Sequence, residues 1–221
     1  MKIVDLHMHT FFSDGILSPA ELVYRCKLKG CQAIAITDHA DYSNYEFVIS
    51  SISRAASKLR DFYEIEVITG VELTYIPPDD IQEMVSNSRQ KGAELVIVHG
   101  ETTAEQVPPG TNMAAVVSKC DILAHPGRLS DEEAKTAAVN DVCIEITTRR
   151  GHRMTNKEVF MKAKKYGCPV LLNTDSHDPD DLLDEDKITG VLDQCGLDNK
   201  YYDEFLKTSC NLIEKIRSNR T

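Results

Sequence analysis

Residues 5–15 read DLHMHTFFSDG. They contain the end of an apolar run, and two histidines lie there two positions apart, His7 and His9. Side chains alternate across a β-strand, so residues two apart share a face and both imidazoles can bind one ion. Asp5 is in phase with the histidines but one layer deeper, where we expect a buried hydrogen-bonding role, and Asp14 follows in the next loop. The stretch therefore predicts a first strand that ends in metal ligands.

Apolar runs rich in Val, Ile and Leu predict seven strands, and the amphipathic segments between them predict helices. The runs are residues 2–9, 31–39, 65–73, 93–100, 121–127, 142–148 and 169–177. Strands that alternate with helices are typical of a parallel sheet with both faces covered. Either a closed barrel or an open doubly wound sheet fits this pattern.

Capping residues predict several helix boundaries. Ser18, with Pro19 next and Glu21 in capping-box register, predicts a helix start, and Thr155 with Glu158 repeats the device. Helix ends are predicted at Gly30, Gly92 and Gly167. We also expect an acidic loop at 178–186 and helices at about 187–195 and 199–219. No Pro/Gly/Ser-rich linker interrupts the chain, which predicts a single domain over residues 1–221.

Composition limits the partners and the location of the protein. The formal net charge of −10 opposes attraction to phosphodiester backbones and anionic membranes, so long nucleic acid and membranes are unlikely partners. The seven cysteines form no C-x-x-C pair, which argues against a disulfide framework. No apolar stretch approaches the roughly 20 residues of a membrane span, and no export signal precedes the first strand. We expect a soluble cytoplasmic protein of open oligomeric state.

Polar residues at the strand ends decide between the two sheet types. Six of the seven histidines lie at or just after the carboxyl end of a predicted strand, and four carboxylates share that location. They are His7, His9, His39, His99, His125 and His177, with Asp14, Asp38, Glu72 and Asp175. In a closed parallel barrel these ends meet at one rim, whereas an open sheet would spread them apart. The distribution therefore favours an α/β barrel.

The cluster predicts a centre with more than one metal ion. Imidazoles mixed with carboxylates suit Zn, Mn or Fe, and there are too many ligands for one four-coordinate ion, so we infer two or three divalent ions. Asp175 and His177 form a second pair two residues apart. A single histidine such as His125 is as often a structural residue as a ligand. If both residues lie in a strand, Asp38 points to the opposite face from His39, so we expect it to cap a turn or to orient a ligand from the second shell.

Six motifs in order resemble the PHP (polymerase and histidinol phosphatase) superfamily of metal-dependent phosphoesterases. They are DLHMHTFFSDG, AITDHAD, GVEL, VHGE, AHPG and LNTDSHD, and they span residues 3 to about 178. The resemblance implies a single PHP domain with a distorted (β/α)7 TIM-like barrel and a trinuclear metal cluster at its carboxyl rim. The superfamily sometimes has histidine where this chain has Asp14, a difference that can weaken the third metal site.

The resemblance also implies a role for each ligand. The first metal would be held by His7, His9, Glu72 and Asp175. The second would be held by His99, His125 and Glu72, which would bridge the first and second metals. The third would be held by Asp14, His39 and His177. Glu72, Asp175 and His177 are the residues that we expect to act in catalysis. The implied substrate is a small phosphorylated metabolite, with histidinol phosphate as the best-known monoester.

A basic segment, TTRRGHR at residues 147–153, follows the sixth predicted strand in an otherwise acidic chain. Cationic donors bind the charged oxygens of a phosphate ester. Arg149, Arg150 and His152 of this segment, and Arg128 after the AHPG motif, are therefore candidates for substrate binding.

Three other functions stay open on the sequence alone. A metal-dependent amidohydrolase also uses H-x-H on its first strand, but such enzymes often need a lysine at the end of strand 4, where this chain has VIVHGE. A small-nucleotide phosphodiesterase or nuclease-like PHP enzyme is the second alternative. A metal-binding regulatory protein without turnover is the third.

Overall fold

The computed structural model of the protein describes residues 2–220 and contains a sheet of eight parallel strands. The strands are β1 (Ile3–Asp5), β2 (Cys31–Ile36), β3 (His39–Ala40), β4 (Glu66–Leu73), β5 (Leu95–His99), β6 (Ile122–Ala124), β7 (Cys143–Thr147) and β8 (Val170–Asn173). Their order is β1-β2-β4-β5-β6-β7-β8, and the two-residue β3 pairs with β4. The seven predicted strands are these seven, and β3 is a short continuation of the second.

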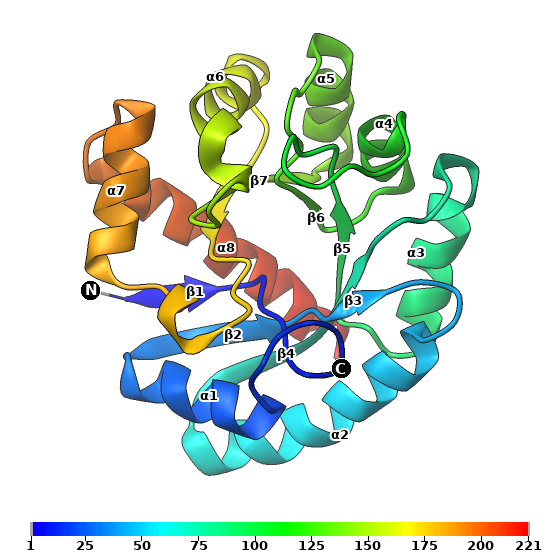
Figure 1. Cartoon of the computed structure of the whole chain (residues 1–221), viewed down its shortest axis with the longest axis vertical. Helices are drawn as coiled ribbons and strands as arrows, with labels where there is room; N and C mark the ends of the chain where they lie inside the picture. The colour runs from blue at the N-terminus through cyan, green and yellow to red at the C-terminus, as the bar shows by residue number, and fades with distance from the viewer. Residues whose placement is uncertain (1, 221) are drawn as a thin grey trace.

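A helix follows each of the seven strand positions, so the predicted (β/α)7 barrel with C-terminal helices is confirmed (Figure 1). The helices are α1 (Pro19–Leu28), α2 (Tyr45–Tyr63), α3 (Ile81–Gln90), α4 (Thr111–Ser118), α5 (Asp131–Asn140), α6 (Asn156–Tyr166), α7 (Glu185–Cys195) and α8 (Lys200–Asn219). Three short 3-10 turns are η1 (Pro78–Asp80), η2 (His152–Thr155) and η3 (Pro179–Asp181). In residues 2–220, no helix has the length and apolarity that a membrane crossing needs.

The two edge strands, β1 and β8, meet beyond the regular sheet and nearly close the barrel. The Leu6 N–H donates to the Asn173 side-chain carbonyl at 2.9 Å, and the Asp175 N–H donates to the His7 carbonyl at 3.0 Å. These bonds join the segments that carry the first and the last candidate ligands. Closure thus occurs at the carboxyl rim, where the barrel is distorted.

Apolar side chains fill the barrel interior, and α8 closes its amino-terminal end. Leu212, Ile213 and Ile216 of α8 pack against inward residues of the strands, and Figure 1 shows α8 passing behind them. Arg220 pairs with Glu66, the first residue of β4. The carboxyl rim is therefore the open end of the barrel.

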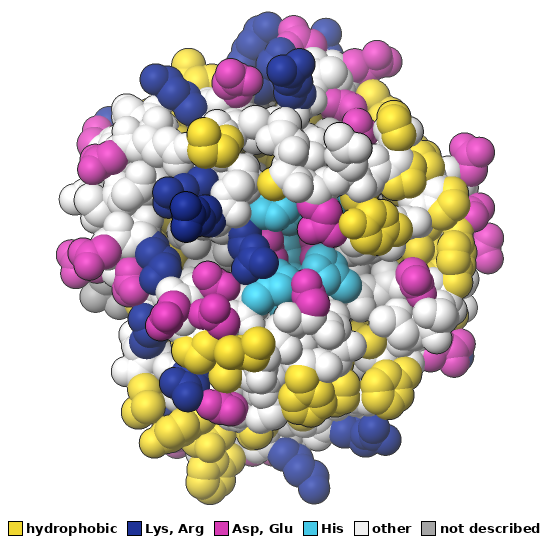
Figure 2. Space-filling model, in the orientation of Figure 1, with side chains coloured by type: hydrophobic (Ala, Val, Ile, Leu, Met, Phe, Trp, Pro, Cys, Tyr) yellow, Lys and Arg dark blue, Asp and Glu magenta, His cyan; other side chains and the backbone are white. Residues whose placement is uncertain are grey.

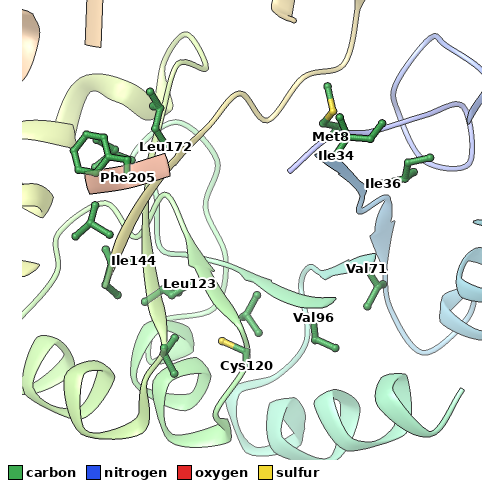
Figure 3. Packing of buried hydrophobic residues seen from close by; sticks show 14 of the residues in the cluster. Met8, Ile34, Ile36, Val71, Val96, Cys120, Leu123, Ile144, Leu172 and Phe205 are labelled. Carbon is green, nitrogen blue, oxygen red and sulfur yellow. The ribbon is translucent and has the colours of Figure 1, made fainter. Parts of the chain in front are cut away.

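A second apolar layer lies between the sheet and the surrounding helices. Figure 3 shows part of it, with Met8, Ile34 and Val71 among the labelled residues. Met8 is buried and its sulfur lies 4.0 Å from that of Cys26 on α1. Because Met8 faces the helices, the residues on either side of it turn the other way, as the alternation of side chains requires.

The three predicted helix ends are confirmed, because Gly30, Gly92 and Gly167 have positive φ just after α1, α3 and α6, whereas only one of the two predicted N-terminal caps forms. Ser18 accepts the N–H of Glu21 at 3.2 Å and caps α1. Thr155 makes no such bond, so the prediction of a capping box with Glu158 is wrong. Thr155 is the last residue of η2 and has helical angles (φ −100°, ψ −1°), whereas an N-cap side chain needs an extended backbone to reach back to the helix.

Candidate metal centre

The structure brings all nine candidate metal ligands together at the carboxyl rim. Figure 2 shows histidine side chains gathered in a hollow of this face, with charged side chains around it. The nine are His7, His9, Asp14, His39, Glu72, His99, His125, Asp175 and His177, and each has a donor atom within 4.8 Å of those of at least two others. Residues from six separate segments of the chain thus share one site.

Glu72, one residue before the end of β4, lies at the centre of the cluster. Its Oε2 is 3.1 Å from His7 Nε2, 3.3 Å from His9 Nε2 and 3.0 Å from His39 Nδ1. Its Oε1 is 3.7 Å from His125 Nε2. One carboxylate therefore faces four imidazoles from three segments of the chain.

Asp175 is the second buried carboxylate and faces Glu72 across the imidazoles. Its Oδ1 is 3.1 Å from His9 Nε2, and its Oδ2 is 3.6 Å from His125 Nε2. Asp175 and His125 both have positive φ, +54° and +25°, a conformation that costs free energy in a non-glycine residue and is concentrated at functional sites. Of the other such residues in 2–220, three end helices: Glu64, Lys119 and Asp141.

A third group of donors lies at the open edge of the hollow. Asp14 Oδ1 is 3.1 Å from His177 Nε2, 3.7 Å from His39 Nε2 and 4.0 Å from His9 Nδ1. The Asp14 side chain is 57% exposed, whereas that of His9 is fully buried. This group is therefore the one that solvent or a ligand reaches first.

Several donor atoms in the cluster are buried and have no hydrogen-bond partner among the described residues. They are His7 Nε2, both ring nitrogens of His9, both carboxylate oxygens of Glu72, His125 Nδ1 and Asp175 Oδ1. The short imidazole–carboxylate distances at Glu72 lack hydrogen-bond geometry. A buried polar atom without a partner costs about 1–3 kcal/mol, and a divalent cation would satisfy several at once. The residues present therefore fit divalent metal ions.

Two aspartates hold the loops that carry the candidate ligands. Asp38 accepts hydrogen bonds from the Thr10 N–H (2.8 Å), the Thr10 hydroxyl (2.7 Å) and the Ser13 hydroxyl (2.7 Å), and so fixes the loop before Asp14. Asp5 accepts from the N–H of Thr174 at 3.2 Å and from its hydroxyl at 2.5 Å, next to Asp175.

Glu145 belongs to the site, and the sequence analysis missed it. This β7 residue is 1% exposed, and its Oε2 lies 2.8 Å from both His7 Nδ1 and Asn173 Nδ2. A carboxylate that accepts the Nδ1 proton leaves Nε2 of the same ring for a metal. The signal was present in VCIEITT, where a charged residue interrupts a run of buried apolar ones.

The candidate substrate-binding residues occupy different positions. Arg149 is half-buried beside the cluster, with Nε 3.8 Å from Asp175 Oδ2 and Nη1 3.1 Å from Asp181. His152 is buried, and its ring centroid lies 4.4 Å from that of His125. Arg150 and Arg128 are exposed, and within residues 2–220 neither forms an ion pair with a candidate ligand.

Burial and neighbouring charges divide the imidazoles into two classes. Burial, together with repulsion from nearby imidazoles, lowers the pKa of His9 and His125 well below the usual value. Burial opposes charge on His7 and His39 as well, but the carboxylates around them outweigh it. Glu72, Glu145 and Asp175 raise the pKa of His7 well above the usual value, and Glu72 and Asp14 raise that of His39 to about 9.

Metal uptake is expected to release protons near neutral pH, because His7 and His39 carry protons in the metal-free protein and a ligand must be neutral. Metal affinity should therefore rise from pH 6.5 to about 9. Calorimetric titration of metal-free protein with Zn²⁺, in two buffers of different ionisation enthalpy, measures the protons released. Equal heats in both buffers, with an affinity that does not change with pH, would contradict this prediction.

Comparison with known proteins identifies the family, because the PHP domain family matches residues 5–119. The chain belongs to the PHP family. This PHP protein is 48% identical over 198 residues to an uncharacterized protein of Methanocaldococcus jannaschii, covering 89% of this chain and 91% of the relative.

Two solved structures show the same fold at 17% identity. A chain of an archaeal ribonuclease P structure with mature tRNA has a TM-score of 0.72, covering 96% of the PHP protein and 90% of that chain. Histidinol phosphate phosphatase from Lactococcus lactis subsp. lactis Il1403, complexed with zinc, L-histidinol and phosphate, has a TM-score of 0.60, covering 88% and 94%.

The family assignment confirms the predicted enzyme class, a metal-dependent phosphoesterase, and leaves the substrate open. The expectation against long nucleic acid stays a prediction, since one chain with this fold comes from a ribonuclease P structure with mature tRNA.

Proposed function

We propose that the PHP protein hydrolyses a small phosphate monoester at a cluster of two to three divalent ions, which are Zn, Mn or Fe. The observation that carries this proposal is the convergence of nine imidazole and carboxylate side chains whose buried donor atoms lack partners. We further propose that residues 1–221 act as one PHP domain, since α8 closes the barrel whose rim carries the site.

The three groups of donors support one ion each. His7, His9, Glu72 and Asp175 would hold the first ion, and Glu72, His99 and His125 the second. Asp14, His39 and His177 would hold the third, with His9 beside them. Bound divalent ions would supply Lewis acidity and lower the pKa of a bound water molecule to about 7.

The chain's own residues would position the ligands and the phosphate. Glu145 keeps the His7 Nε2 turned toward the cluster, and Asp38 holds the loop of Asp14 at the open edge. Glu72 and Asp175, two buried carboxylates, offset the charge of the cations. Arg149, anchored by Asp181, is placed to donate to phosphoryl oxygens above Asp175, where His177 also borders the opening.

Arg149→Ala is expected to lower kcat/KM for a phosphate monoester by about 10- to 100-fold. This is the decrease in rate that corresponds to the loss of one hydrogen bond between charged groups. Its metal content should not change. The matched control is Arg150→Ala, because Arg150 is exposed and makes no ion pair with the described ligands. Equal losses in both variants would show that Arg149 has no special place in phosphate binding.

The cavity beside the third group of donors supports a substrate with a cationic leaving group. It has a volume of about 320 Å³ and is lined by Asp14, Asp41, Glu105 and Tyr75, among others. Carboxylates and an aromatic ring suit an amine. We therefore propose an amino-alkyl phosphate, of which histidinol phosphate is the first to test.

A panel of phosphorylated metabolites, assayed with Mn²⁺, Zn²⁺ and Fe²⁺ and after complete chelation, tests the proposed function. We expect turnover of monoesters, highest for those that carry an amine, and none without metal. Activity that persists after metal removal would contradict the proposal, and hydrolysis of amides or lactones alone would favour an amidohydrolase. Metal binding without any turnover would indicate a regulatory protein.

A phosphodiesterase acting on small nucleotides or RNA is the second candidate, because the fold is shared with a chain of a ribonuclease P structure at a TM-score of 0.72. The same panel should include a dinucleotide and a short oligoribonucleotide. Diester cleavage faster than monoester hydrolysis would favour this candidate over the first.

A further inference from the structure

We propose that His152 binds the same divalent ion as His125 and so adds a fourth donor to the second ion of the cluster. The inference rests on the proposed metal cluster, and it gives His152 a role different from the substrate binding expected of it. It starts from the position of His152 in η2, on the loop between β7 and α6, and not on any strand of the barrel.

The turn that carries His152 is packed against the loop that follows β5. His152 is 8% exposed, although it lies in a loop at the rim. Gly151, the residue before it, has a φ of +97°, and a Cβ at this position would lie 3.2 Å from Cβ of Ala104. The close approach of the two loops turns the imidazole inward.

A hydrogen bond fixes one ring nitrogen of His152. Its Nδ1 lies 2.9 Å from Oγ1 of Thr102, which is 4% exposed and lies three residues after His99. The Thr102 N–H donates to the Gly100 carbonyl at 2.8 Å, so the backbone that carries this hydroxyl is fixed as well. Metal-binding histidines are held in this way, with one nitrogen bonded to the protein and the other left for the ion.

The ring of His152 lies within reach of an ion held by its neighbours. Its centroid is 4.4 Å from that of His125 and 6.1 Å from that of His99. Donor atoms of His152, His125 and Asp175 all lie within 4.8 Å of one another. An ion between His99 and His125 would then have three imidazoles and a carboxylate, a nitrogen-rich set that suits Zn better than Mn.

Zinc affinity tests this inference without relying on turnover. Metal-free protein is titrated with Zn²⁺ against a chromophoric chelator. His152→Ala is expected to lower the affinity for one of the bound ions by about 10- to 100-fold, the size of effect known for metal-site substitutions. The affinity for the other ions should not change. Thr102→Val should lower the affinity for the same ion by a smaller factor, and Thr102→Ser, which keeps the hydroxyl, should have an affinity close to that of the wild type. Arg153→Ala, an exposed residue of the same turn, is the matched control.

A second measurement separates a local effect from misfolding and from substrate binding. The Co²⁺ absorption spectrum of His152→Ala should change in intensity, because one ion loses a nitrogen ligand, while the thermal midpoint of the metal-free variant stays close to wild type. Wild-type zinc affinity in His152→Ala, together with a raised KM for phosphate esters, would overturn the inference and make His152 a substrate ligand. If the wild-type protein binds none of Zn²⁺, Mn²⁺ and Fe²⁺, the proposed function itself fails.

Discussion

Glu72→Gln is expected to abolish turnover and to remove metal from the protein, with a loss in kcat/KM of at least about 1,000-fold. The reason is the central position of this carboxylate, which faces His7, His9, His39 and His125. A neutral amide keeps the volume but loses the charge that offsets the cations. Several kcal/mol of charge stabilisation are lost, and each 1.36 kcal/mol is tenfold in rate. Metal analysis and steady-state kinetics check both parts.

Glu145→Gln is the matched control, because Glu145 contacts His7 on its other ring nitrogen. The same change of charge in the same buried region should weaken metal affinity by about 10- to 100-fold, since Glu145 orients a ligand and does not itself bind the ion. Turnover at saturating metal should then largely recover. Identical behaviour of the two variants, or normal turnover in Glu72→Gln without metal, would contradict the assignment.

Metal removal is expected to lower the thermal midpoint of the protein by about 5–10 °C. Without cations, the buried donor atoms of His9, Glu72 and Asp175 lack partners, and ligand binding to the folded state alone adds about 2.7 kcal/mol when the metal is at 100 times Kd. For a chain of this length, each kcal/mol shifts the midpoint by about 2–4 °C. Differential scanning calorimetry with Zn²⁺ and with a chelator measures the shift.

The Glu72→Gln protein provides the control for this experiment, because it should show little shift on metal addition. Its metal-free form is expected to be at least as stable as metal-free wild type, since the amide removes a buried charge. An equal shift in variant and wild type would mean that Zn²⁺ stabilises the fold at some other place on the acidic surface.

Local patterns predicted the strands and the ligands that lie on them. Buried parallel strands are continuous apolar runs, so seven of them were recognisable, and H-x-H spacing placed His7 and His9 on one face. The same rule could not show that β2 ends at Ile36 and that His39 belongs to a separate two-residue strand. At this break the Asp38 carboxylate accepts hydrogen bonds from the loop after β1, a contact between segments remote in sequence.

Tertiary contacts decided the features that the sequence did not predict. Glu145 resembles an isolated charge in a strand until β7 and β1 place it against His7. His152 lies in the loop after β7, and its burial depends on the packing of this loop against the segment after β5, where it contacts Thr102. The position of α8 likewise follows from a tertiary contact, since three of its apolar residues pack against the amino-terminal end of the barrel. They are Leu212, Ile213 and Ile216.

The central claim is that remote segments of the chain form one cluster of divalent ions, and anomalous diffraction tests it most directly. Crystals grown with Zn²⁺ or Mn²⁺ and measured at the absorption edge of the metal locate each bound ion. We predict two or three anomalous peaks between His7, Glu72, His125 and His177, each about 2.0–2.2 Å from imidazole nitrogens or carboxylate oxygens. The absence of any peak in this hollow, with ions only at exposed acidic side chains, would contradict the account.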